Sequence, residues 1–173
     1  MAGVRKYASF FEWHDKARKE LGVVEELLRS LDSESNLGLR NPRINKPDPP
    51  DCICEDCNGN SIGVEVAELV CEETAGRNAR GEDVMRVWYP GELYAHVDSL
   101  LQEKDRKKYH GGPYKGIVVC LFTDEPMLTL TDAQQELAGV KFGPLHQVTT
   151  AFLVFSYDPS TKSFPVITLQ IAA

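Results

Sequence analysis

The fold is decided by residues 47–68, which read PDPPDCICEDCNGNSIGVEVAE. The dipeptide Asn58-Gly59 predicts a tight turn, because both residue types tolerate a positive φ. We therefore expect a hairpin of two antiparallel strands, over residues 51–56 and 61–70, with the turn between them. One acid stands at the start of the first strand, and another stands in the middle of the second strand. The hairpin places these two acids on neighbouring strands.

Side chains alternate between the two faces of the second strand. Ile62, Val64 and Val66 point to one face, and Glu65 points to the other. Because an unpaired buried carboxylate is costly, a glutamate within an apolar strand is either exposed to solvent or held by a partner. In an α/β protein with both faces of its sheet covered, we expect the second arrangement. The first acid, Asp51, has a simpler alternative role, which is to bond backbone amides at the end of a proline-rich loop.

Hydrophobic periodicity predicts the other elements of the chain. They are a helix over residues 9–31 capped by Ser9, a connecting loop over 32–50, a polar stretch over 71–91, a helix over 92–108, a strand over 116–122, a short helix over 131–137 capped by Thr131, and strands over 149–157 and 164–171. This order predicts an α/β protein with a mixed sheet flanked by helices. A length of 173 residues fits a single domain over residues 1–173.

The charge balance limits the partners of the protein. There are 26 acidic and 19 basic residues, which give a net charge of −7, and this disfavours tight, nonspecific binding to long duplex DNA. Positive charge is concentrated over residues 104–108, which leaves room for a small metal-bridged substrate or a protein partner. The apolar runs are too short to span a bilayer and no leader opens the chain, so we expect a cytoplasmic protein with no membrane partner. The sequence indicates no oligomeric state.

Four of the five cysteines lie within twenty residues of one another, which raises the alternative of a zinc-stabilised domain. They are Cys52, Cys54, Cys57 and Cys71. The zinc signature is incomplete, because a second Cys-x-x-Cys pair or a histidine pair at matching distance is missing. We favour the alternative in which Cys52 and Cys54 pack as small apolar side chains on a strand and Cys57 lies in the turn.

The acids of the hairpin suggest a different metal. Asp51 and Glu65 lie on neighbouring strands and can converge on one divalent cation. Mg²⁺ and Mn²⁺ prefer hard oxygen ligands and are typically held by one or two carboxylates together with water and phosphate oxygens. Such an ion polarises a phosphate and lowers the pKa of a bound water.

Pro50-Asp51 at the start of a strand, followed by Glu65-Val66-Ala67 in the next strand, resembles the PD-(D/E)xK phosphodiesterase superfamily, which has the restriction-endonuclease-like fold. The resemblance extends to the layout, because a helix precedes the hairpin and a basic helix precedes the next strand. It implies an Mg²⁺- or Mn²⁺-dependent nuclease that acts on nucleic acid. It further implies that Asp51 and Glu65 hold the metal, with an additional glutamate such as Glu20 from the first helix.

The chain departs from the family pattern at Ala67, where the family has a lysine that orients or activates the attacking water. One interpretation is that a basic residue from elsewhere takes this place, either Lys104 and Lys108, one helical turn apart, or Lys115. A second is that Glu20 or Glu68 adds a metal ligand and the metal alone activates the water. In the third, catalysis is lost and the fold persists as a non-catalytic interaction module.

Overall fold

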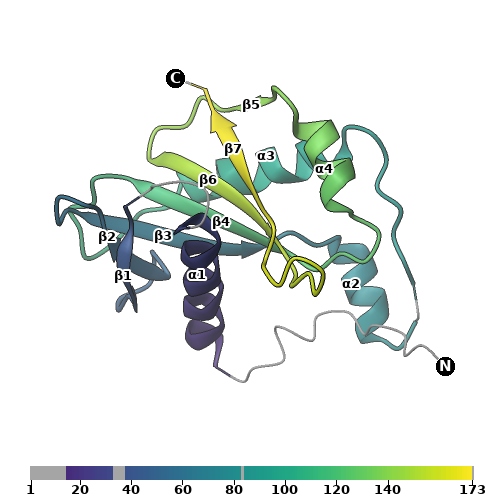
Figure 1. Ribbon diagram of the computed structural model, residues 1–173, viewed down its shortest axis with the longest axis horizontal. Coiled ribbons are helices and arrows are strands. Elements are labelled where there is room, and N and C mark those ends of the chain that lie inside the picture. The colour runs from purple at the N-terminus through teal and green to yellow at the C-terminus, as the bar shows by residue number, and fades with distance from the viewer. Residues whose placement is uncertain (1–14, 33–37, 83, 173) are drawn as a thin grey trace.

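A computed structural model describes residues 15–32, 38–82 and 84–172, and Figure 1 shows its ribbon. Within these ranges the chain forms four helices and seven strands. In chain order they are α1 (Lys16–Asp32), β1 (Arg40–Ile44), β2 (Cys52–Glu55), β3 (Ser61–Glu68), α2 (Glu72–Ala79), α3 (Glu92–Asp105), β4 (Ile117–Thr123), α4 (Leu130–Leu137), β5 (Lys141–Phe142), β6 (Val148–Phe155) and β7 (Val166–Ile171).

The strands form one mixed sheet in the order β1-β2-β3-β4-β6-β7-β5. The pairs β1-β2 and β2-β3 are antiparallel, whereas β3, β4 and β6 run parallel to one another. β7 is antiparallel to β6, and β5 is parallel to β7. Parallel neighbours need a long crossover connection, and here α2 and α3 lie between β3 and β4 while α4 lies between β4 and β6. The predicted α/β class with a mixed sheet flanked by helices is confirmed.

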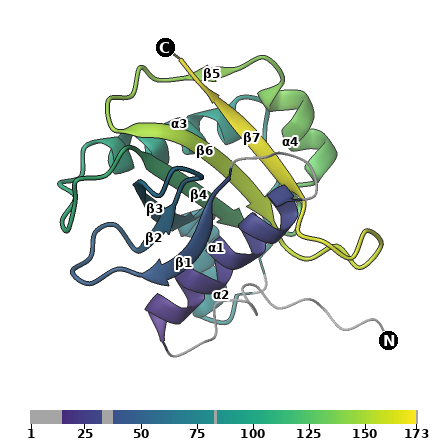
Figure 2. The same ribbon diagram turned by 60° about the vertical axis from the view of Figure 1, so that its left-hand side comes forward.

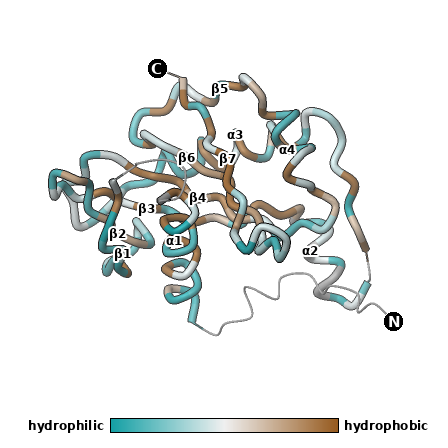
Figure 3. The backbone as a smooth tube through the Cα atoms, in the orientation of Figure 1, coloured by the Kyte–Doolittle hydropathy of each residue, from teal (hydrophilic) through white to brown (hydrophobic). Residues whose placement is uncertain are grey.

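Helices cover both faces of the sheet, as the two views in Figures 1 and 2 show. Val23, Val24 and Leu27 of α1 belong to the core on one face, and the buried side chains of α3 and α4 belong to the core on the other. Every residue of β4 is buried, and Figure 3 shows hydrophobic residues concentrated along the central strands. Because both faces are covered, a side chain in the middle of β3 is removed from water whichever face it points to.

The predicted hairpin is present as β2 and β3. The two strands pair antiparallel, with Cys52 opposite Val64, and the turn contains Gly59 at a φ of 80°. Asp56 closes the turn by accepting a hydrogen bond from the backbone N–H of Asn60 at 2.9 Å. The turn chemistry therefore sets the register that brings the two acids of the hairpin together.

Three helix boundaries differ from the prediction. The helix expected over residues 9–31 begins at Lys16, and the side chain of Asp15 accepts a hydrogen bond from the N–H of Arg18 at 3.3 Å. The helix expected to run over residues 92–108 ends at Asp105. The backbone N–H of the next residue, Arg106, donates to the carbonyls of Glu103 and Lys104. The N-cap of α4 is Thr129 and not Thr131, because the Thr129 hydroxyl accepts a hydrogen bond from the N–H of Asp132 at 3.1 Å. None of the helices in the described ranges combines the length and the hydrophobicity needed to cross a membrane.

Three elements were not predicted. The expected loop over residues 32–50 contains the edge strand β1, the polar stretch over residues 71–91 contains α2, and β5 is a two-residue strand beside β7. β1 has an exposed or half-buried side chain at every position, so its sequence lacks the apolar alternation that identifies a strand. Ser9, the expected cap of the first helix, lies outside the described residues.

Candidate metal centre

The hairpin brings Asp51 beside Glu65. Cys52 is paired with Val64, so Asp51, one residue earlier, comes next to Glu65 on the neighbouring strand. The Asp51 carboxylate accepts a hydrogen bond from the N–H of Val66 at 2.8 Å. Asp51 is 6% exposed and Glu65 is fully buried. The convergence of these two predicted acids therefore has a geometric cause, which is the register of β2 and β3.

A third carboxylate joins this pair. Asp48, Asp51 and Glu65 each offer an oxygen that lies within 4.8 Å of those of the other two, and Asp48 is exposed at the surface. The proline-rich loop that carries Asp48 is held by buried Asn45, whose side chain donates to the carbonyl of Pro47 at 2.7 Å. The sequence reasoning missed Asp48, although it lies three residues before Asp51 in the same quoted stretch.

Two lysines reach Glu65 from the face covered by α3. The Nζ of Lys107 lies 2.7 Å from the Oε2 of Glu65, and the Nζ of Lys104 lies 3.2 Å from the same oxygen. Lys104 is in the last turn of α3, and Lys107 is in the turn after the helix. Lys108, which was predicted to share a helix face with Lys104, is exposed, and no contact with these carboxylates is found for it among the described residues. The helix ends too early for that prediction to hold.

The carboxylates and lysines change the acid–base properties of one another. Burial, reinforced by the nearby charges of Glu65 and Glu20, raises the pKa of Asp51 to about 6, against the lowering effect of the Val66 N–H. For Lys107, burial favours the neutral amine, but the hydrogen bond to Glu65, the contact with Lys104 and the charges of Glu65 and Asp51 together outweigh burial and raise the pKa. The second oxygen of Glu65, Oε1, is buried and has no hydrogen-bond partner. One ligand atom of the group is therefore still available.

The other acids named from the sequence lie outside this group. Glu20 is almost buried on α1 and pairs with Lys16, whose Nζ lies 3.1 Å from its Oε1. Glu20 is close enough to raise the pKa of Asp51 but is not one of the three clustered acids. Glu68 ends β3, where burial and then the charge of Asp124 raise its pKa.

The third basic residue named from the sequence, Lys115, has a different partner. Its Nζ lies 2.8 Å from the Oδ2 of Asp56, the acid that closes the hairpin turn. Both the hydrogen bond and the charge of Asp56 raise the pKa of Lys115. Lys115 therefore supports the turn, whereas Lys104 and Lys107 are the lysines that reach Glu65.

The cysteines do not form a metal site within the described residues. Cys52 and Cys54 are fully buried in the core under α1, and Cys57 is exposed in the turn. Burial raises the pKa of Cys52 to about 12 and that of Cys54 to about 11, so both remain protonated thiols near neutral pH. Cys71 receives a hydrogen bond from Arg86 at 3.1 Å. In the described ranges, the one group of three clustered metal-ligand side chains contains carboxylates alone.

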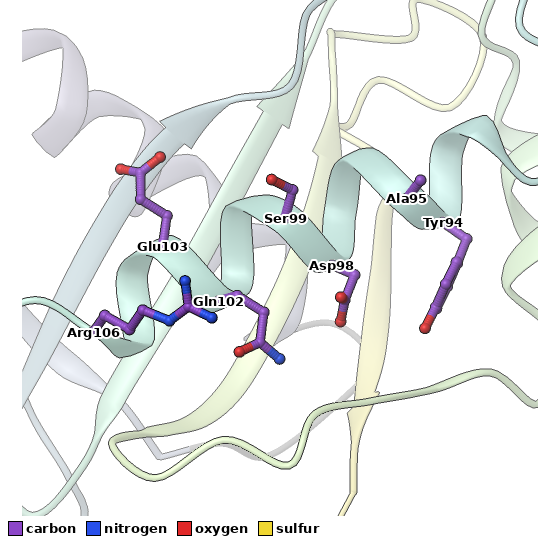
Figure 4. A pocket seen from close by; sticks show the side chains of 7 residues that line it. All are labelled: Tyr94, Ala95, Asp98, Ser99, Gln102, Glu103 and Arg106. Atoms are coloured by element: carbon purple, nitrogen blue, oxygen red, sulfur yellow. The ribbon is translucent and has the colours of Figure 1, made fainter.

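A surface pocket lies elsewhere, along the outer side of α3, and Figure 4 shows the side chains that line it. They are Tyr94, Ala95, Asp98, Ser99, Gln102, Glu103 and Arg106. None of the three clustered acids and neither of the two lysines belongs to this lining. Its residues come from a single helix and the residue that follows it, so the pocket brings no separate segments together.

No family model, curated protein or solved structure matches the chain. The observations that bear on function are therefore the three carboxylates, the two lysines and the available oxygen of Glu65.

Proposed function

We propose that this protein is a divalent-metal-dependent phosphodiester hydrolase that binds Mg²⁺ or Mn²⁺ through Asp48, Asp51 and Glu65. Three carboxylate oxygens within 4.8 Å of one another suit a small hard cation. The proposal rests on the two lysine ammonium groups that lie 2.7 and 3.2 Å from the Oε2 of Glu65. They supply the positive charge that Ala67 cannot supply in β3.

The layout of the chain supports the resemblance to the PD-(D/E)xK superfamily. The helix α1 precedes the hairpin of β2 and β3, and α3 precedes β4, which runs parallel to β3. The two acids come from the positions that the family motif implies. The lysine function comes instead from the end of α3, in agreement with the interpretation that a basic residue from elsewhere replaces it.

The two lysines have different surroundings and we assign them different roles. The side chain of Lys104 is 10% exposed, so its ammonium offsets the buried charge of Glu65. The side chain of Lys107 is 30% exposed, so its ammonium can also bond a phosphate oxygen from solvent and stabilise charge that develops there. A bound Mg²⁺ or Mn²⁺ would polarise the phosphate and lower the pKa of a water molecule.

A purely structural ion pair explains these contacts less completely. A buried carboxylate that serves stability alone usually has hydrogen-bond partners for both oxygens, but Oε1 of Glu65 has none. The ion pair also gives no reason for Asp48 to lie within reach of the two buried acids. Neighbouring acids repel one another, and the charges of Glu65 and Asp48 add to the larger effect of burial in raising the pKa of Asp51.

The test is metal binding and cleavage by the whole protein. We expect calorimetry to detect Mg²⁺ or Mn²⁺ binding that Asp51→Asn and Glu65→Gln each weaken. We expect metal-dependent cleavage of single- or double-stranded DNA or RNA that falls about a hundredfold or more in Lys107→Met, because a lost charge-stabilising contact costs about that much. Lys115→Met removes a lysine that is bonded to Asp56, and it serves as the matched control with unchanged cleavage.

Each negative result has a different meaning. Absence of metal binding, or metal binding that Glu65→Gln leaves unchanged, would contradict the proposal. Metal binding without cleavage of any of the four nucleic acids would leave a non-catalytic, metal-stabilised interaction module. Stoichiometric zinc in protein purified without chelator would instead support the cysteine site.

A further inference from the structure

The end of α3 is fastened to the start of β6 by the carboxylate of Asp105. This side chain is 6% exposed. Its Oδ1 accepts hydrogen bonds from three consecutive backbone N–H groups, those of His146 at 2.9 Å, Gln147 at 2.7 Å and Val148 at 2.9 Å. Hydrogen bonds from amides to a carboxylate are stronger than those between neutral groups. Asp105 therefore docks the last residue of the helix onto the sheet.

The side chain of Gln147 holds the backbone at Asp105 and at Lys107. Its Nε2 donates to the backbone carbonyl of Asp105 and to the backbone carbonyl of Lys107, the latter at 3.0 Å. The backbone carbonyl of Gln147 in turn accepts from the N–H of Ile117 at the start of β4. Gln147 thus links the turn that carries Lys107 to two strands of the sheet.

We infer that Asp105 and Gln147 are positioning residues that place the ammonium groups of Lys104 and Lys107 on Glu65; the catalytic role of the lysines rests on the proposed function. A lysine in β3 would be held by the sheet itself. A lysine beyond the end of a helix has less support, and the N–H of Lys107 makes one hydrogen bond back to the helix, to the carbonyl of Lys104 at 3.2 Å. The hydrogen bonds of Asp105 and Gln147 restrict this turn.

Two hydrogen bonds made by residues after the turn also restrain the segment that carries the lysines. The hydroxyl of Tyr109 donates to the backbone carbonyl of Lys104 at 2.6 Å, and the N–H of His110 donates to the carbonyl of Pro49 at 2.9 Å. Pro49 lies between two of the clustered acids in the chain. The segment that carries the lysines is therefore bonded to β6 before the turn and to the acidic loop after it.

The test uses Gln147→Met, which keeps the length of an exposed side chain and removes both amide donors. Gln135→Met, at an exposed glutamine of α4, is the matched control. Protein with ¹⁵N-labelled lysine is examined by NMR for side-chain ammonium resonances, which become visible when an ion pair slows their proton exchange. We expect the Lys107 resonance, assigned by its absence in Lys107→Met, to be present in the wild type and in Gln135→Met and to be lost in Gln147→Met, with little change in the melting temperature.

A Lys107 resonance that Gln147→Met leaves unchanged overturns the inference, and so does its absence from the wild type. Asp105→Asn provides a second variant, with a shift or loss of the Lys104 and Lys107 resonances expected. If the wild type cleaves phosphodiesters, Gln147→Met should lower kcat about tenfold to a hundredfold, because small displacements of catalytic groups cost that much, and the metal concentration for half-maximal activity should stay the same. A wild type without cleavage contradicts the proposed function alone, because the NMR result still decides whether Gln147 positions Lys107.

Discussion

Two buried carboxylate sites, 40 residues apart in the chain, are treated differently by the fold. The carboxylate of Asp105 is surrounded by three backbone N–H groups, and these hydrogen bonds lower its pKa despite the opposing effect of burial. Glu65 forms ion pairs with two lysines through one oxygen and has no partner on the other. Its neighbour Asp51 has a pKa raised to about 6.

This difference distinguishes an acid that stabilises the fold from an acid that is available for chemistry. Backbone amides satisfy Asp105 completely, and they cannot move away without unfolding the start of β6. Lysine side chains satisfy Glu65 partly, and they can turn toward another anion when a cation takes their place. Saturation by the backbone marks a structural acid, and partial satisfaction by side chains beside other acids marks a candidate ligand.

The largest expected effect is on stability when the saturated acid is removed. Asp105→Ala leaves three N–H groups in a partly buried position without an acceptor, at about 1–3 kcal/mol for each unsatisfied donor. We expect the free energy of unfolding at pH 7 to fall by about 4 kcal/mol in chemical denaturation. Because the folded-state pKa of Asp105 lies below 3.8, the difference from wild type should shrink as the pH falls below that value. A loss under about 1 kcal/mol would contradict the structural role.

The second effect is stabilisation by metal, which should appear at one site only. At a concentration of Mg²⁺ or Mn²⁺ a hundred times the Kd, binding to the folded state raises the free energy of unfolding by about 3 kcal/mol. We expect this gain in the wild type and in Asp105→Asn, and we expect its loss in Glu65→Gln. Denaturation with and without the ion measures it. An equal gain in all three proteins would place the binding site elsewhere.

The third effect is a pH dependence of opposite sign at Asp51. Its pKa is about 6 in the folded protein and 3.8 in the unfolded reference, so Asp51 binds a proton on folding between these values and its contribution to stability falls as the pH rises from 4 to 6. Asp51→Asn cannot ionise. In metal-free buffer its stability relative to wild type should therefore improve by about 2–3 kcal/mol between pH 4 and pH 8. A relative stability that is flat with pH would show that Asp51 titrates normally.

The smallest effect belongs to an acid that is also saturated but is paired with an exposed lysine. Asp56 closes the hairpin turn and pairs with Lys115, whose side chain is 57% exposed. Lys115→Met should lower the melting temperature very little, as is usual for the loss of an exposed ion pair, measured by thermal denaturation in parallel with wild type. A loss of stability comparable to that in Asp105→Ala would contradict the distinction between support by the backbone and support by side chains.

The sequence predicted the parts that depend on local chemistry. The turn at Asn58-Gly59, the pairing of the two hairpin strands and a buried, partnered Glu65 all follow from turn preference and from alternation in a strand covered on both faces. Lys104 was also named correctly as a lysine that reaches this acid. These features need only neighbouring residues or the general architecture of the fold.

The parts that were missed depend on where elements end. Lys108 was expected one helical turn after Lys104, but α3 ends at Asp105 and the following turn brings Lys107 to Glu65 instead. The end of the helix is set by hydrogen bonds to β6, more than 40 residues later, and no local pattern contains that information. Asp48 was missed for a similar reason, because its proline-rich loop is bonded to the segment after α3, where the N–H of His110 donates to the carbonyl of Pro49.

The fastening of α3 to β6 also bears on when the site forms as the chain is made. Glu65 and Lys107 are 42 residues apart, and Asp105 and Gln147 are another 42 apart, so the loops between them must close before either contact contributes. A chain that ends before Val148 already contains all three acids and both lysines but lacks the strand that fixes the turn. The site is therefore assembled late, by the last third of the sequence. A nascent chain contains the residues of the site well before these residues are held in the geometry described above.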